Sequence, residues 1–89
     1  MSDDVARGYH NLGNIILKQD GDLVKAEKLV REAYRNRAQL PGEPLCLGLT
    51  ANILGHILYK RGNHDEAKKM YERFLAVSMR HEGMDGVNT

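Results

Sequence analysis

Residues 52–75 read NILGHILYKRGNHDEAKKMYERFL, and the rest of the chain repeats the organisation of these residues. Asn63 stands at a helix N-cap position, and Glu66 three residues later can reach back to its amide, which is the pattern of a capping box. Gly62 can adopt the left-handed conformation that ends the preceding helix. The stretch therefore predicts two helices joined by a tight polar turn.

Both halves of the stretch carry an amphipathic pattern. After the turn, apolar or small residues recur at three- and four-residue spacing, at Ala67, Met70, Tyr71, Phe74, Leu75 and Ser78. Ahead of the turn, the same spacing links Leu47, Ala51, Leu54, Gly55 and Leu58. Gly55 lies inside a predicted helix, where glycine costs about 1 kcal/mol relative to alanine, so we expect it to let a neighbouring helix come close.

The preceding part of the chain has the same organisation. Residues 3–18 and 23–39 show helical patterns, with Gly21 predicted to end the first helix and Asp22 to cap the second. Residues 40–44, LPGEP, contain both prolines of the chain, and no helix continues through them. A third helix is expected to begin at Leu45.

The two predicted hairpins are copies of one unit. A shift of 42 residues matches Leu54, Gly55, Ile57 and Lys60 with Leu12, Gly13, Ile15 and Lys18. After the turn, a shift of 41 residues matches Gly62, Ala67 and Lys69 with Gly21, Ala26 and Lys28, so the first turn holds one extra residue near Asp20. A helix-turn-helix unit of this period is the signature of an α-solenoid.

We therefore predict an all-α fold with one domain of two repeats over residues 1–82. The repeats are expected at about residues 3–40 and 45–82. Gly83 matches Gly42 at the 41-residue shift, so residues 83–89 are expected to be a tail that begins an incomplete third repeat.

Composition limits the classes of function. The chain has 89 residues, enough for one small domain, and its formal net charge of +1 gives no basic excess for nucleic acid. We find neither a signal peptide nor an apolar run long enough to span a membrane, so we expect a cytoplasmic protein that binds neither nucleic acid nor membrane. The single cysteine, Cys46, cannot form an internal disulfide and is expected to be a small buried side chain.

The sequence carries no motif for catalysis or for a cofactor. Its glycines are isolated, and no nucleophile elbow or Cys/His signature stands in a plausible context. No two of the four histidines are three or four residues apart on one helix, as a helical metal site requires. His10 and His56 fall on neighbouring first helices, so a shared metal site is one hypothesis, but we prefer solvated or groove-lining histidines. We expect no enzyme activity, no cofactor and no metal.

Several motifs resemble the tetratricopeptide repeats, in particular the longer-period form of kinesin light chains. The resemblance rests on Y-x-x-L-G-x-x-I at residues 9–16, on A-x-x-L-G-x-x-L at residues 51–58 and on A-x-x-x-Y at residues 67–71. The chain departs from the family pattern at the extra residue near Asp20 and at Ala38 and Met79, which replace a closing proline. The resemblance implies a short right-handed α-solenoid that serves as a non-enzymatic protein-interaction scaffold.

In this family the first helix of each repeat lines a concave groove. The resemblance implies a peptide-binding groove formed by Arg7, His10, Asn11, Asn14, Lys18, Leu49, Asn52, His56, Tyr59 and Lys60. Asparagine carries one acceptor and two donors on a short arm, so it can hold the amide of an extended peptide in both directions. Arg7, Lys18 and Lys60 would favour a partner with carboxylates. The alternative interpretation is that these polar stripes are only solvated helix faces.

The sequence also supports a second function, self-association. Two repeats leave an apolar face of the last helix without a neighbour, and Met70, Phe74 and Val77 are the expected contact residues. The chain would then be a fragment or an engineered piece of a longer solenoid, held in a homo-oligomer or by neighbouring repeats.

Overall fold

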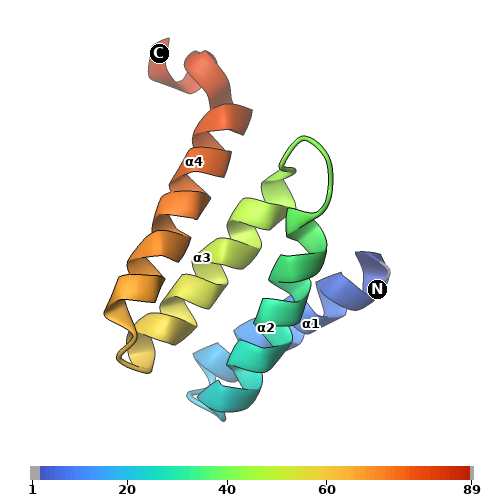
Figure 1. Ribbon diagram of the computed structural model, residues 1–89, viewed down its shortest axis with the longest axis vertical. Coiled ribbons are helices and arrows are strands. Elements are labelled where there is room, and N and C mark those ends of the chain that lie inside the picture. The colour runs from blue at the N-terminus through green and yellow to red at the C-terminus, as the bar shows by residue number, and fades with distance from the viewer. Residues whose placement is uncertain (1–2, 89) are drawn as a thin grey trace.

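The computed structural model describes the backbone of residues 3–88 and the side chains of residues 4–81. In this range the chain forms four helices and no strand: α1 (Asp3–Lys18), α2 (Leu23–Ala38), α3 (Leu45–Lys60) and α4 (His64–Asn88) (Figure 1). The all-α repeat fold predicted from the sequence is therefore confirmed. Within residues 3–88, no helix combines the length and the apolar character that crossing a membrane requires.

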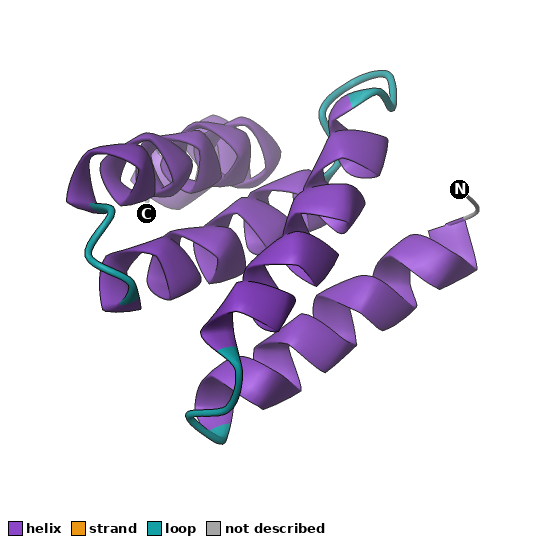
Figure 2. Cartoon of the chain, turned by 60° about the horizontal axis from the view of Figure 1, so that its bottom comes forward, coloured by secondary structure: helices purple, strands orange, loops and turns teal. Residues whose placement is uncertain are grey.

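The helices form two hairpins that stack on each other (Figure 1 and Figure 2). α1 packs against α2 and α3 packs against α4, while α2 also packs against α3 and so joins the two repeats. α1 approaches α3 over a much shorter length. The two first helices are therefore neighbours with a hollow between them.

The core consists mainly of aliphatic side chains, and two glycines let the helices come close around it. The largest fully buried apolar side chains are Val30, Leu47, Leu54, Ile57, Leu58 and Val77. A Cβ atom at Gly55 would lie 2.9 Å from the ring of Tyr71, so the close approach expected there is confirmed. Gly13 allows the same close approach in the first hairpin, where a Cβ atom would lie 2.2 Å from Cγ2 of Val30.

The two turns inside the hairpins share one hydrogen-bonding pattern although their sequences differ. Asp20 in the first turn and Gly62 in the second both have left-handed backbone, with φ of 53° and 87°. In each turn the next residue, Gly21 or Asn63, donates its N–H to a carbonyl five residues earlier at 2.9 Å, which is the Schellman pattern. Asp20 and not Gly21 therefore ends the first helix, because aspartate tolerates this conformation. Asp22 caps α2 as expected, since its carboxylate accepts two backbone N–H groups of the first turn.

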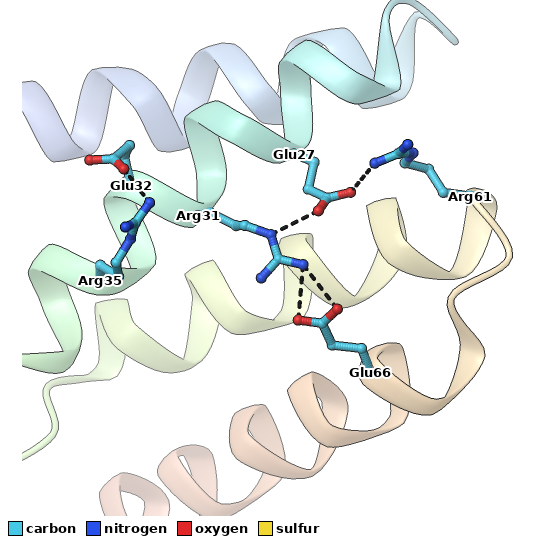
Figure 3. Close-up of polar contacts among 6 residues, drawn as sticks. All are labelled: Glu27, Arg31, Glu32, Arg35, Arg61 and Glu66. Carbon is cyan, nitrogen blue, oxygen red and sulfur yellow. Dashed lines mark hydrogen bonds and ion pairs between the residues drawn. The ribbon is translucent and has the colours of Figure 1, made fainter.

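An ion-pair network ties the two repeats together (Figure 3). Arg31 donates from Nε to Glu27 at 2.8 Å and from Nη2 to Glu66 at 2.9 Å, and Glu27 also accepts from Arg61. Burial by itself would raise the pKa of Glu27, but the hydrogen bonds and charges of the two arginines outweigh it and lower that pKa. Glu27 and Arg31 belong to the first hairpin, whereas Arg61 and Glu66 belong to the second. The network therefore fixes one hairpin against the other.

The linker between the hairpins is anchored to α4 through Glu43. Its carboxylate accepts from Arg80 at 2.8 Å and pairs with Arg73 at 3.6 Å, and its carbonyl accepts from a ring nitrogen of His81 at 2.8 Å. Glu43 itself has a left-handed backbone, with φ of 46°. These contacts hold the linker in a defined path from α2 into α3.

α4 is longer than the repeat comparison predicts. Its helical backbone continues to Asn88, so residues 83–88 do not turn away as residues 42–44 do. The linker after α2 contains both prolines, whereas residues 83–88 contain two glycines and no proline. A glycine inside a helix costs about 1 kcal/mol and a proline about 3 kcal/mol, so the helix continues where the prolines are absent.

Candidate functional site

A hollow of about 450 Å³ lies between α1 and α3. Its lining comes from both first helices and consists of Asn14, Leu17, Lys18, Asn52, Ile53, His56 and Lys60. We call this surface the α1–α3 groove. The two asparagines, the two lysines and His56 belong to the groove predicted from the sequence. Leu17 and Ile53 were not part of that prediction, because their apolar side chains match the core pattern.

The groove presents two uncommitted amides. Asn14 and Asn52 are half-buried, and neither side chain forms a hydrogen bond with another residue among the described side chains. His56 is exposed and packs edge-on against Tyr71, with ring centroids 5.4 Å apart and an interplanar angle of 86°. The amide donors and acceptors therefore lie beside an apolar floor and are free to bind a ligand.

Two lysines give the far end of the groove a positive bias. Lys60 donates to Asp20 at 2.7 Å, and this hydrogen bond, with the lysine charge, lowers the pKa of the Asp20 carboxyl. Lys18 forms no ion pair or hydrogen bond with any side chain of residues 4–81. One cation is therefore paired, and the other is available to an acidic partner.

His10, a predicted groove residue, does not line the hollow, and its ring instead contacts Thr50 of α3. Its Nδ1 lies 3.0 Å from the hydroxyl of Thr50, and that hydroxyl donates to the Cys46 carbonyl at 2.8 Å. Because the hydroxyl hydrogen is already used, Nδ1 of His10 is the donor and carries the hydrogen. Burial, followed by the nearby charge of Arg37, lowers the pKa of His10. The half-buried His10 therefore favours the neutral form. Cys46 itself is only partly buried, less than the sequence predicts.

Arg37 of α2 is a buried charged residue beside Thr50 that was not predicted from the sequence. It is only 5 % exposed, and its Nη1 donates to Thr50 at 2.9 Å. Its Nε has no acceptor, and none of the described carboxylates pairs with it. A signal was present, because residue 37 follows Val30 and Ala33 at helical spacing and so falls on the buried face of α2.

The remaining predicted groove residues lie outside the hollow. Arg7 is exposed and pairs with Asp4 at 3.2 Å, and Asn11 and Leu49 are exposed on α1 and α3. Tyr59 points elsewhere and stacks on His64, with ring centroids 4.7 Å apart. The structure therefore brings together one compact part of the predicted groove.

Among the side chains of residues 4–81, no cluster of three or more His, Cys, Asp or Glu residues has a metal-binding arrangement. A family model described as tetratricopeptide repeat matches residues 4–80. The chain belongs to the tetratricopeptide repeat family. Curated proteins and solved structures gave no significant match. The resemblance drawn from the repeated motifs is thus confirmed, and the kinesin-light-chain-like type agrees with the matched model. Tetratricopeptide repeats generally mediate protein–protein interaction.

The outer face of the second tetratricopeptide repeat differs from the self-association face expected from the sequence. Val77 is 0 % exposed, because it packs beneath Gly48 of α3, so it cannot contact a second molecule. Met70 and Phe74 are half-buried, and Met70 packs against the core. Within residues 64–81 of α4, the exposed large apolar residues are instead Leu75 and Met79. The expected stripe faces α3, and a neighbouring stripe faces outward.

Proposed function

We propose that this tetratricopeptide repeat protein is a non-enzymatic interaction module that holds a peptide segment in the α1–α3 groove. The observation that carries the proposal is the pair of half-buried, uncommitted amides of Asn14 and Asn52 above the apolar floor of Leu17 and Ile53. An extended peptide presents alternating N–H and C=O groups, and an asparagine amide can bind both. Apolar side chains of the peptide would cover the floor.

The unpaired Lys18 gives the proposed ligand a chemical preference. A carboxylate on the peptide would form a charge-assisted hydrogen bond with it, and such bonds are shorter and stronger than neutral ones. Lys60 is already shared with Asp20 and contributes less. We therefore propose a peptide with an acidic residue near the Lys18 end of the groove.

The test begins with peptides selected from a display library against the immobilised chain. The affinity of a selected peptide is then compared for the wild type, Asn14→Ala, Asn52→Ala and the control Asn11→Ala. Asn11 is on the same helix as Asn14 but does not line the hollow. Loss of one neutral hydrogen bond costs about 0.5–1.5 kcal/mol, so each groove variant should bind about 2- to 10-fold more weakly. The control should bind like the wild type.

Circular dichroism should show the same helical content for all four proteins. Equal affinities for the two groove variants and the wild type would refute the groove assignment. Lys18→Gln adds a test of the acidic preference, since it should weaken a peptide with a free carboxylate more than the same peptide with an amide in its place.

A further inference from the structure

A second hollow, of about 350 Å³, lies on the outer face of the second repeat. It is lined mainly by apolar groups from the end of α3 and the first half of α4 and is separate from the α1–α3 groove. The residues that matter for its chemistry are Tyr59, Ala67, Lys68, Tyr71, Glu72 and Leu75. Tyr59 is held in place by its stack on His64.

The equivalent residues of the first repeat indicate what kind of surface fits this hollow. A shift by one repeat places its apolar lining on residues that hold the second hairpin against the first, namely Leu17, Ala26, Val30 and Tyr34. These four pack in one cluster with Leu54, Ile57 and Leu58 of α3. The same shift places Lys68 on Glu27 and Glu72 on Arg31, which form the ion pairs between the hairpins. The hollow is therefore a second version of the junction that already receives α3.

The opposite end of the molecule carries the matching surface. Leu12 and Ile15 of α1 are 43 % and 50 % exposed. Their counterparts one repeat later are Leu54 and Ile57, which are 1 % and 0 % exposed because they fill the junction between the hairpins. α1 thus presents the apolar residues that α3 uses to dock.

We propose that a second copy of this chain docks head to tail, with its first hairpin seated on the outer face of the second repeat. Leu12 and Ile15 of the docking copy would enter the hollow beside Tyr71 and Leu75. Such a contact joins two different surfaces and does not close, so it leads to stacks whose length grows with concentration.

The charges favour a first hairpin as the occupant. Within the chain, Arg31 pairs with Glu66, but the counterpart of Arg31 is Glu72, whose charge is reversed. A docked first hairpin brings Lys25 to the position of Glu66, so Lys25 meets Glu72 with opposite charge. A docked second hairpin would bring Glu66 to Glu72, and these like charges would repel.

The other charged position agrees with this choice. Glu27 accepts from Arg61, and its counterpart in the outer hollow is Lys68. A first hairpin brings the neutral Gln19 to the position of Arg61, whereas a second hairpin would set Arg61 against Lys68. Both positions therefore accept the first hairpin of another copy and reject the second.

The test measures the molar mass of the full chain by sedimentation equilibrium over a dilution series. The variants Leu12→Asp and Leu75→Asp each place a charge on one of the two surfaces, at positions that are already partly exposed. We expect the wild-type mass to rise with concentration and each variant alone to stay monomeric. An equimolar mixture of the two variants should form a one-to-one dimer, because each variant keeps the surface that the other has lost.

Charge reversal tests the register without disturbing an apolar surface. Lys25→Glu and Glu72→Lys should each raise the dissociation constant about two- to fivefold, and the double variant should restore it. Lys28→Glu changes the net charge equally, but its counterpart Lys69 forms no ion pair or hydrogen bond with the first hairpin among the side chains of residues 4–81, so it should have no effect. A wild type that is monomeric at every concentration, a Leu12→Asp variant that still dimerises, or a mixture that stays monomeric would each overturn the proposal.

Discussion

Gly8 and Gly13 lie on the same helix and differ in what surrounds them, so the pair can test how closely α1 and α2 pack. A Cβ atom at Gly13 would lie 2.2 Å from Cγ2 of Val30 and 3.4 Å from the Ala26 carbonyl oxygen. A Cβ atom at Gly8 would meet nothing within 4 Å. We therefore expect Gly8→Ala to raise the free energy of unfolding and Gly13→Ala to leave it unchanged or lower it.

The magnitude follows from two terms. Both variants gain the helix propensity of alanine over glycine, which is about 1 kcal/mol. Only Gly13→Ala must also move a fully buried side chain, and overpacking of this kind costs about 1–3 kcal/mol. Val30 has little freedom to rotate away, because a β-branched side chain in a helix has essentially one preferred rotamer. Gly8→Ala should therefore stabilise the chain by about 1 kcal/mol, and Gly13→Ala should be less stable than Gly8→Ala by about 1–3 kcal/mol.

Urea unfolding followed by circular dichroism provides the measurement. Each variant is compared with the wild type at a protein concentration where the chain is monomeric, so that association does not add to stability. The comparison between the variants is the decisive quantity, because the propensity gain is common to both and cancels. Equal stabilisation by the two alanines would refute the close packing of Gly13 on Val30.

Two further predictions concern the hydrogen-bonded cluster of His10, Thr50 and Arg37. Burial and the charge of Arg37 lower the pKa of His10, so the unfolded chain binds a proton more readily than the folded chain. The free energy of unfolding should therefore fall as the pH drops below about 6.5. His10→Gln should reduce this pH dependence, measured by urea unfolding at several pH values. Thr50→Val removes the acceptor of the buried Arg37 and should cost about 1–3 kcal/mol. Arg37→Met by itself should leave the free energy of unfolding nearly unchanged or raise it. In the Arg37→Met background, Thr50→Val should cost less than in the wild type. An equal cost in both backgrounds would contradict the role given to the Arg37–Thr50 hydrogen bond.

The helices and their repeat could be predicted because they depend on signals between residues that are close in the sequence. Apolar spacing, the cap at Asp22 and the glycine at residue 62 depend only on neighbouring residues, and the structure agrees with each. The end of the first helix could not be assigned to Asp20, because glycine at residue 21 is the stronger general signal for left-handed backbone. The position of a break depends on hydrogen bonds across the turn as well as on residue type.

The outward faces could not be predicted in the same way. The second helix of a solenoid repeat has two neighbours, its own first helix and the first helix of the next repeat, so apolar residues occur on two adjoining stripes. Residues 70, 74 and 77 and residues 71, 75 and 79 both satisfy helical spacing, and only the packing against α3 distinguishes them. Tyr59 was misplaced for the same reason, because it lies one position from Lys60 and near the boundary between two faces.

The two proposed surfaces become coupled when copies stack. Each docked copy would set its own α1 beside the α3 of its neighbour, as α1 lies beside α3 within one chain, so the groove would continue from one copy to the next. A peptide long enough to reach both copies binds the stack more tightly than the monomer, and by linkage it must then strengthen the stack by the same factor. A peptide confined to one groove binds the monomer and the stack equally well, so it does not change the association of the copies. The affinity of long peptides should therefore depend on the concentration of the chain, and that of short peptides should not.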